Sequence, residues 1–93
     1  MTAQISVQSL NETRFEVTVE EEGSQTRHIV TVEPAYASKL AGSGVSTEDL
    51  VRRSFEFLLE REPKESILRG FNLREISRYY PDYEVEIREQ LAR

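Results

Sequence analysis

The chain has 93 residues, a length that predicts one domain near the lower end of the sizes that can bury an adequate core without crosslinks. It contains no cysteine, which excludes disulfides and thiolate metal sites as supports for that core. Its net charge of -5, from 17 acidic and 12 basic residues, argues against a broad nucleic-acid-binding surface, because such surfaces neutralise phosphates with cations.

The N-terminal third alternates apolar and polar residues, as half-buried antiparallel strands do. In "TRFEVTVE" Phe15, Val17 and Val19 fall on one face. After a glycine-containing turn, "TRHIVTVE" alternates again, with His28, Val30 and Val32 in phase. We therefore expect strands at about residues 4–9, 13–20 and 26–33.

The alternation also predicts how these strands pair. A turn centred on Glu22 and Gly23 sets Val17 opposite His28 and Phe15 opposite Val30, so that all the in-phase residues share one face. That register is the one consistent with a single buried face.

The first connection follows from the same argument. A three-residue connection at residues 11–13 sets Val7 opposite Val17 and Ile5 opposite Val19, whereas a two-residue connection would turn Val7 toward the wrong face. The result is a three-stranded meander whose apolar face still needs a cover.

Two helices are expected to supply that cover. Pro34 suits the first position of a short helix at residues 34–40. Ser46 is a favoured N-cap for a long helix at 47–62, which Pro63 ends. The apolar arc of this long helix spans roughly 200°, about twice what one contact surface needs, so we expect the helix to lie between the sheet and the C-terminal segments.

The C-terminal third is expected to form short helices at residues 64–69, 73–80 and 83–92. Asn72 and Asp82 are the expected N-caps of the second and third of these helices, and Phe71 can staple onto Ile76. The predicted fold class is α+β: a three-stranded antiparallel meander packed on one long helix, followed by two or three short C-terminal helices, in one domain of residues 1–93.

Catalytic signatures are weak throughout the sequence. His28 is the only imidazole and is expected to be a partly buried structural residue, with a pH-sensitive or functional role as the alternative. No serine lies in a G-x-S-x-G elbow, and the glycines form neither a dinucleotide fingerprint nor a phosphate-binding loop. We expect no enzymatic activity, no cofactor, no metal and no small-molecule substrate.

One arginine-bearing face near the C-terminus could contact phosphate. Arg74 and Arg78 share a side of the expected 73–80 helix, and Arg69 lies just upstream. Tyr83 completes the candidate binding set, since the tyrosines around Pro81 could stack on bases. The alternative is that these arginines pair with nearby glutamates and that the tyrosines wedge a helix corner in the core.

Two segments show resemblances. The run "FEFLLEREPKESIL" followed by "FNLREISRYYPDYEVEI" is similar to small bacterial proteins of uncharacterised function, a resemblance that covers the C-terminal half and implies no activity. The order of alternating strands followed by "STEDLVRRSFEFLLE" resembles HicB-type antitoxin domains. Here "EPAYASKLAGSG" occupies the connection that is acidic and glycine-containing in that family, and no residue role is carried over.

These observations favour a non-enzymatic protein-interaction or regulatory module. Its expected partner is an unidentified protein or a second copy, with the sheet edge available for pairing. The alternative is a small nucleic-acid-associated or antitoxin-like regulator that uses Arg69, Arg74 and Arg78, although nucleic acid is the less expected partner. No apolar run approaches the ~20 residues of a membrane span and the start lacks signal-peptide features, so a cytoplasmic location without membrane contact is expected.

Overall fold

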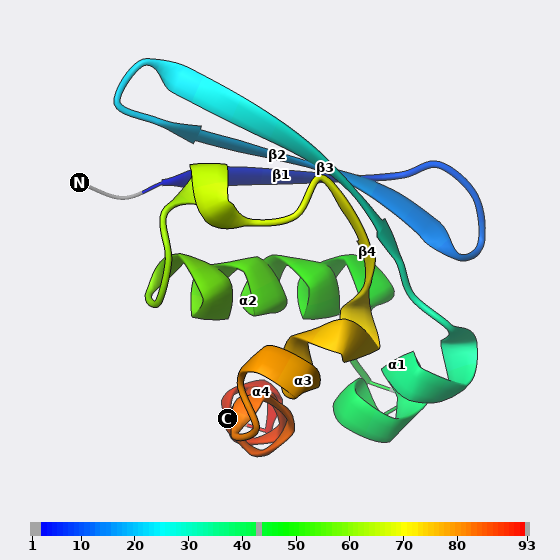
Figure 1. Ribbon diagram of the computed structural model, residues 1–93. Helices are drawn as coiled ribbons and strands as arrows, with labels where there is room; N and C mark the ends of the chain where they lie inside the picture. Colours follow the sequence, from blue (N-terminus) through cyan, green and yellow to red (C-terminus); the bar gives the residue numbers. More distant parts are fainter. Residues whose placement is uncertain (1–2, 43, 93) are drawn as a thin grey trace.

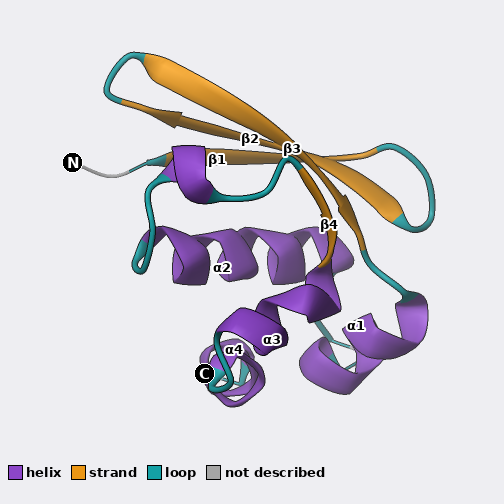
Figure 2. Cartoon of the chain, viewed as in Figure 1, coloured by secondary structure: helices purple, strands orange, loops and turns teal. Residues whose placement is uncertain are grey.

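The computed structural model describes residues 3–42 and 44–92 (Figure 1). A four-stranded sheet lies on one side of the molecule and the four α-helices lie on the other (Figure 2). The elements in chain order are β1 (Gln4–Ser9), β2 (Arg14–Glu21), β3 (Ser24–Thr31), α1 (Pro34–Ala41), α2 (Thr47–Leu59), the 3-10 turn η1 (Lys64–Ser66), β4 (Gly70–Asn72), the 3-10 turn η2 (Leu73–Glu75), α3 (Ile76–Tyr79) and α4 (Tyr83–Leu91).

The sheet contains the predicted meander and one additional strand. Its order is β1-β2-β3-β4, with β1, β2 and β3 antiparallel in succession. The expected three-stranded antiparallel sheet is therefore corrected to a four-stranded mixed one, because β4 pairs with β3 in parallel through Gly70 and Asn72. The α+β class is confirmed.

The predicted register is confirmed at every pair named above. Val17 lies opposite His28, and Phe15 lies opposite Val30. Val7 lies opposite Val17, and Ile5 lies opposite Val19. One buried face and a side-chain period of two are enough to fix this register, because a slip by one residue would expose the whole apolar set.

Two local devices close the strand connections. The Leu10 N–H donates to the Arg14 carbonyl oxygen at 2.8 Å and encloses the expected three-residue connection, where the Asn11 side-chain oxygen accepts two backbone N–H groups. In the second turn Glu22 and Gly23 have φ of 54° and 80°, the left-handed conformation that a tight hairpin requires.

Helix α2 lies between the sheet and the remaining helices (Figure 1), as its wide apolar arc predicted. Leu50, Val51 and Phe55 are fully buried in the core that it forms with the sheet. The Ser46 hydroxyl caps the helix by accepting from the Asp49 N–H at 3.1 Å. The helix ends at Leu59, three residues earlier than expected.

The C-terminal third departs most from expectation. Residues 64–66 form only one 3-10 turn, and the chain then runs extended into β4. The extended path is favoured because the free side of β3 forms hydrogen bonds with the backbone of this segment. The Ile29 N–H donates to the Arg69 carbonyl oxygen at 2.8 Å. The Asn72 cap is confirmed as a capping box with Glu75. Asp82 precedes α4, but its carboxylate accepts no capping hydrogen bond.

Within residues 3–42 and 44–92, none of the helices has both the length and the apolar character needed to cross a bilayer.

Candidate functional site

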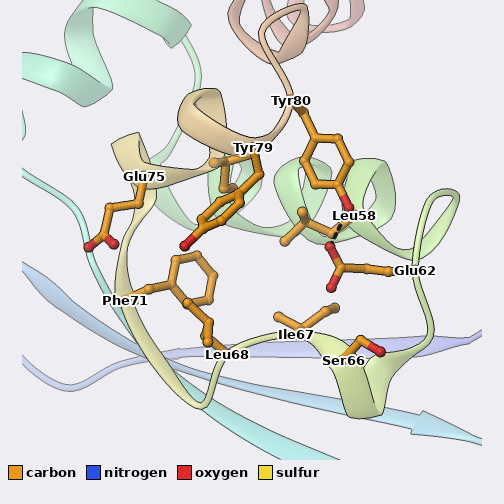
Figure 3. Close-up of a pocket in the computed structure, with 10 residues that line it drawn as sticks. Leu58, Glu62, Ser66, Ile67, Leu68, Phe71, Glu75, Tyr79 and Tyr80 are labelled. Carbon is orange, nitrogen blue, oxygen red and sulfur yellow. Dashed lines mark hydrogen bonds between the residues drawn. The ribbon is translucent and has the colours of Figure 1, made fainter.

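An apolar pocket of about 260 Å³ opens between α2, β4 and α3 (Figure 3). Its walls come from successive segments of residues 58–80, which fold back around it. The lining residues are Leu58, Glu62, Ser66, Ile67, Leu68, Phe71, Glu75, Ile76, Tyr79 and Tyr80.

The extended path into β4 creates this pocket. Ile67 is buried beneath it, while the next residue, Leu68, is 51% exposed and stands at its rim. Phe71 and Ile76, the pair expected to staple the following helix, both line the wall. Had residues 64–69 formed the expected helix, Leu68 would not have been held in this extended segment beside α3.

The opposite rim carries tyrosines from the end of α3. Tyr79 is 67% exposed, the largest exposure among the bulky hydrophobic residues of the described chain. The Tyr80 hydroxyl donates to the Glu62 carboxylate at 2.6 Å, and this hydrogen bond, followed by desolvation, raises the pKa of Tyr80. Figure 3 shows Glu62 beside Tyr80 and Glu75 on the other side of the pocket, so a carboxylate stands at each end.

His28 fixes the segment that carries Leu68. Its Nδ1 lies 2.7 Å from the Leu68 carbonyl oxygen, which can only accept, so Nδ1 carries the proton. Its Nε2 then accepts from the Thr26 hydroxyl at 2.8 Å. The ring is fully buried against Phe55, and desolvation lowers the pKa of His28; the bond to Leu68 opposes this, and the nearby Arg69 adds to it. The expected structural histidine is therefore neutral and doubly hydrogen-bonded.

A second hollow, the arginine cleft, lies between α1, α3 and α4 and measures about 620 Å³. It brings together two of the four candidate binding residues, Arg74 and Arg78, with a cation from α1 that sequence reasoning did not associate with them. The lining residues are Tyr36, Lys39, Asn72, Arg74, Glu75, Ser77, Arg78 and Glu84.

Acidic groups balance much of the positive charge in the arginine cleft. Arg74 pairs with Glu33 at 3.2 Å, and Lys39 pairs with Glu84 at 3.5 Å. The Tyr36 hydroxyl also donates to Glu84 at 2.8 Å; this bond is the largest of the influences that lower the pKa of Glu84. The expected pairing with glutamates is thus present for Arg74 only, whose partner is Glu33. No ion pair of Arg78 is found among the described residues.

The other two candidate binding residues lie elsewhere. Arg69 precedes β4 and lines neither hollow. Tyr83 is fully buried: its hydroxyl lies 2.6 Å from the Ser54 hydroxyl, its ring packs edge-on against Phe57, and burial raises its pKa. Tyr83 is therefore a core residue that does not reach the arginine face, in agreement with the alternative of a wedge at a helix corner.

Neither hollow has the donor set of a metal site. Within the described ranges no group of three or more His, Asp or Glu side chains is placed to hold a metal ion. Comparison of the chain with protein-family models, with curated proteins and with solved structures found no match.

Proposed function

We propose that the protein is a non-enzymatic interaction module that holds a large apolar side chain of a partner protein in the apolar pocket. The observation that carries the proposal is the exposure of Leu68 and Tyr79 at the rim of a hollow whose walls are largely apolar. Exposed apolar side chains that gather around a concavity are typical of protein-binding surfaces, whereas scattered ones are not.

The size of the pocket supports a side chain as its occupant. Small-molecule and cofactor sites usually enclose about 300–1,000 Å³. At about 260 Å³ this pocket is smaller and open, which suits one anchoring residue of a peptide segment. Aromatic and large aliphatic residues are the usual anchors of such interfaces, because they bury the most apolar area for each side chain that is immobilised.

The charges around the pocket favour a basic partner segment. Glu62 and Glu75 stand at its two ends, and the whole chain carries a net charge of -5. A lysine or arginine next to the anchor would meet one of these carboxylates, whereas an acidic neighbour would be repelled. The proposed partner is therefore an apolar residue flanked by basic ones.

The polar groups of the pocket support binding rather than acid–base catalysis. An efficient general acid or base has a pKa near the working pH. The bond to Glu62 moves the pKa of Tyr80 upward, away from neutrality. The one imidazole, His28, lies buried with both nitrogens hydrogen-bonded.

Selection of peptides from a random displayed library tests the proposal. We expect the selected peptides to share a large apolar residue with lysine or arginine nearby, and to lose at least about tenfold in affinity on the Leu68→Asp variant, since an anchor contact is worth more than ~1.4 kcal/mol. Tyr79→Ala should also weaken binding, with little change in stability because the side chain is exposed.

Val85→Asp is the matched control. Val85 is 58% exposed on α4 and does not line the pocket, so the same change in charge and apolarity should leave peptide affinity unchanged. Peptides that bind Leu68→Asp as tightly as the unaltered protein, or that carry no apolar anchor, would contradict the proposal.

Nucleic-acid binding is a second candidate, which the gathering of Lys39, Arg74 and Arg78 in one cleft supports. Phosphate contacts must give affinity that falls steeply with salt, so a gel-shift series against salt is the test. Arg78→Glu should abolish such binding and Arg27→Glu, an exposed site on β3, should affect it less. Absence of a shift at low salt would remove this candidate.

A further inference from the structure

Strand β1 forms a complete open edge of the sheet, and its chemistry differs from that of the rest of the chain. It lies at the end of the strand order, next to β2 only. No residue of Gln4–Ser9 is charged or proline, although charged residues make up 31% of the sequence. Edge strands are usually protected by charges, proline, bulges or a cover. The opposite edge strand, β4, has only 3 residues.

The direction of the backbone groups on β1 follows from the hydrogen bonds of the other strands. Successive residues of an antiparallel strand direct their N–H and C=O groups to alternate sides. The Ile29 N–H donates to Arg69 on the β4 side, so its opposite residue on β2, Glu16, directs its backbone groups away from β3 and toward β1. Thr18, two residues further along β2, does the same.

Thr18 lies opposite Ser6, so the backbone of Ser6 bonds inward to β2. The neighbours Ile5 and Val7 therefore direct their N–H and C=O groups outward, to the open side. An independent contact agrees with this: the Arg52 guanidinium on α2 reaches the edge and donates to the Ile5 carbonyl oxygen. Arg52 is the one side chain that hydrogen-bonds this edge among the described residues.

This edge is complementary to itself. In an antiparallel pair centred on Ser6, Ile5 faces Val7 of a second copy, and Val7 faces Ile5, through the outward-directed backbone groups. Gln4 then faces Gln8, and the two Ser6 side chains meet on the two-fold axis on the outer face of the sheet. Ile5 and Val7 are half-buried at the margin of the core, so such pairing continues the apolar layer from one copy into the other.

Charge does not oppose a second copy at β1. Two chains that each carry -5 repel one another, and repulsion is smallest where neither presents a charged side chain. A symmetric contact of this kind is also closed, because both copies use the same edge, β1, and that edge is then occupied in each.

We propose that the protein forms a two-fold symmetric dimer in which two β1 strands pair antiparallel about Ser6. This pairing joins the two four-stranded sheets into one continuous sheet of eight strands. The hydrogen bond from Arg52 to Ile5 is then replaced by the backbone N–H of Val7 from the second copy. This surface is separate from the apolar pocket, which lies on the helical side of the molecule.

Sedimentation velocity over about a hundredfold range of concentration, with charge variants at Ser6, tests the proposal, because mass action makes a reversible dimer depend on concentration. Ser6 is exposed, and its backbone bonds to β2 do not depend on its side chain. Ser6→Lys and Ser6→Glu should each remain monomeric at concentrations where the unaltered protein is dimeric, since like charges meet on the axis. An equal mixture of the two variants should form dimers again.

Gln25→Lys is the matched control, because Gln25 is exposed on the same outer face but on β3, and the change in net charge is the same. This variant should dimerise as the unaltered protein does. Urea unfolding verifies that all the variants are folded. A protein that stays monomeric throughout the range, Ser6→Lys that dimerises normally, or a mixture that stays monomeric would each overturn the proposal.

Discussion

At the scale of single residues, His28 connects the sheet to the apolar pocket. It spans Thr26 and the carbonyl of Leu68, and both hydrogen bonds need the neutral ring with its proton on Nδ1. A protonated ring would have to donate from Nε2 to a hydroxyl that now donates to it, while fully buried. Protonation of His28 therefore destabilises the segment that positions Leu68.

This predicts a pH dependence of the free energy of unfolding. The pKa of His28 lies below its ordinary value in the folded protein, so the unfolded chain binds more protons once the pH falls below about 6.5, the unfolded pKa. The contribution of His28 is complete above that value and is lost as the pH falls toward the folded pKa, with a slope of at most about 1.4 kcal/mol per pH unit.

Urea unfolding between pH 7.5 and pH 5, about one to two units either side of the ordinary histidine pKa, measures this slope. The pKa values of Glu65 and Glu84 are lowered, so these carboxyls titrate below that window. In His28→Gln, which keeps a donor toward Leu68 but does not titrate, the slope should be smaller. An unchanged slope in that variant would contradict the assignment.

At the scale of elements, the strands with a periodic apolar pattern are predictable from the sequence, whereas β4, which depends on pairing with a distant segment, is not. The register of β1 to β3 follows from alternation at residues such as Val7, Val17 and Val30, because one face is buried. β4 has three residues and no period of its own, and it exists because the Ile29 backbone meets Arg69 from forty positions away. The apolar pocket depends on that path, so its position was not predictable from local pattern.

The capping residues of the C-terminal helices provide a prediction at this scale. Asn72 accepts from the Arg74 N–H at 3.2 Å and completes a capping box, so Asn72→Ala should lower the free energy of unfolding by about 1 kcal/mol. Asp82→Ala should cost markedly less, because the Asp82 side chain accepts no capping hydrogen bond. Urea midpoints of the two variants give the comparison, and equal losses would contradict it.

At the scale of the whole molecule, three surfaces differ in the charge that they carry. The arginine cleft gathers three cations, yet Glu33 and Glu84 neutralise two of them by direct pairing. The apolar pocket has carboxylates at both ends, and β1 has no charge at all. This distribution of charge is the basis of the two proposals, a basic partner segment at the pocket and a second copy of the uncharged strand at the sheet edge.

These surfaces should respond differently to salt. Added salt screens the repulsion between two chains of charge -5, because the Debye length of the solution falls from about 30 Å at 0.01 M to about 10 Å at 0.1 M. The proposed β1 dimer should therefore become tighter as the salt concentration rises. Binding of basic peptides at the apolar pocket should weaken over the same range, because there the screened charges attract. Sedimentation velocity for the dimer and fluorescence anisotropy of a labelled peptide measure the two trends. Self-association that weakens with salt would point to contacts between opposite charges, such as the arginine cleft against the acidic rim of the pocket, and would contradict pairing through the uncharged edge.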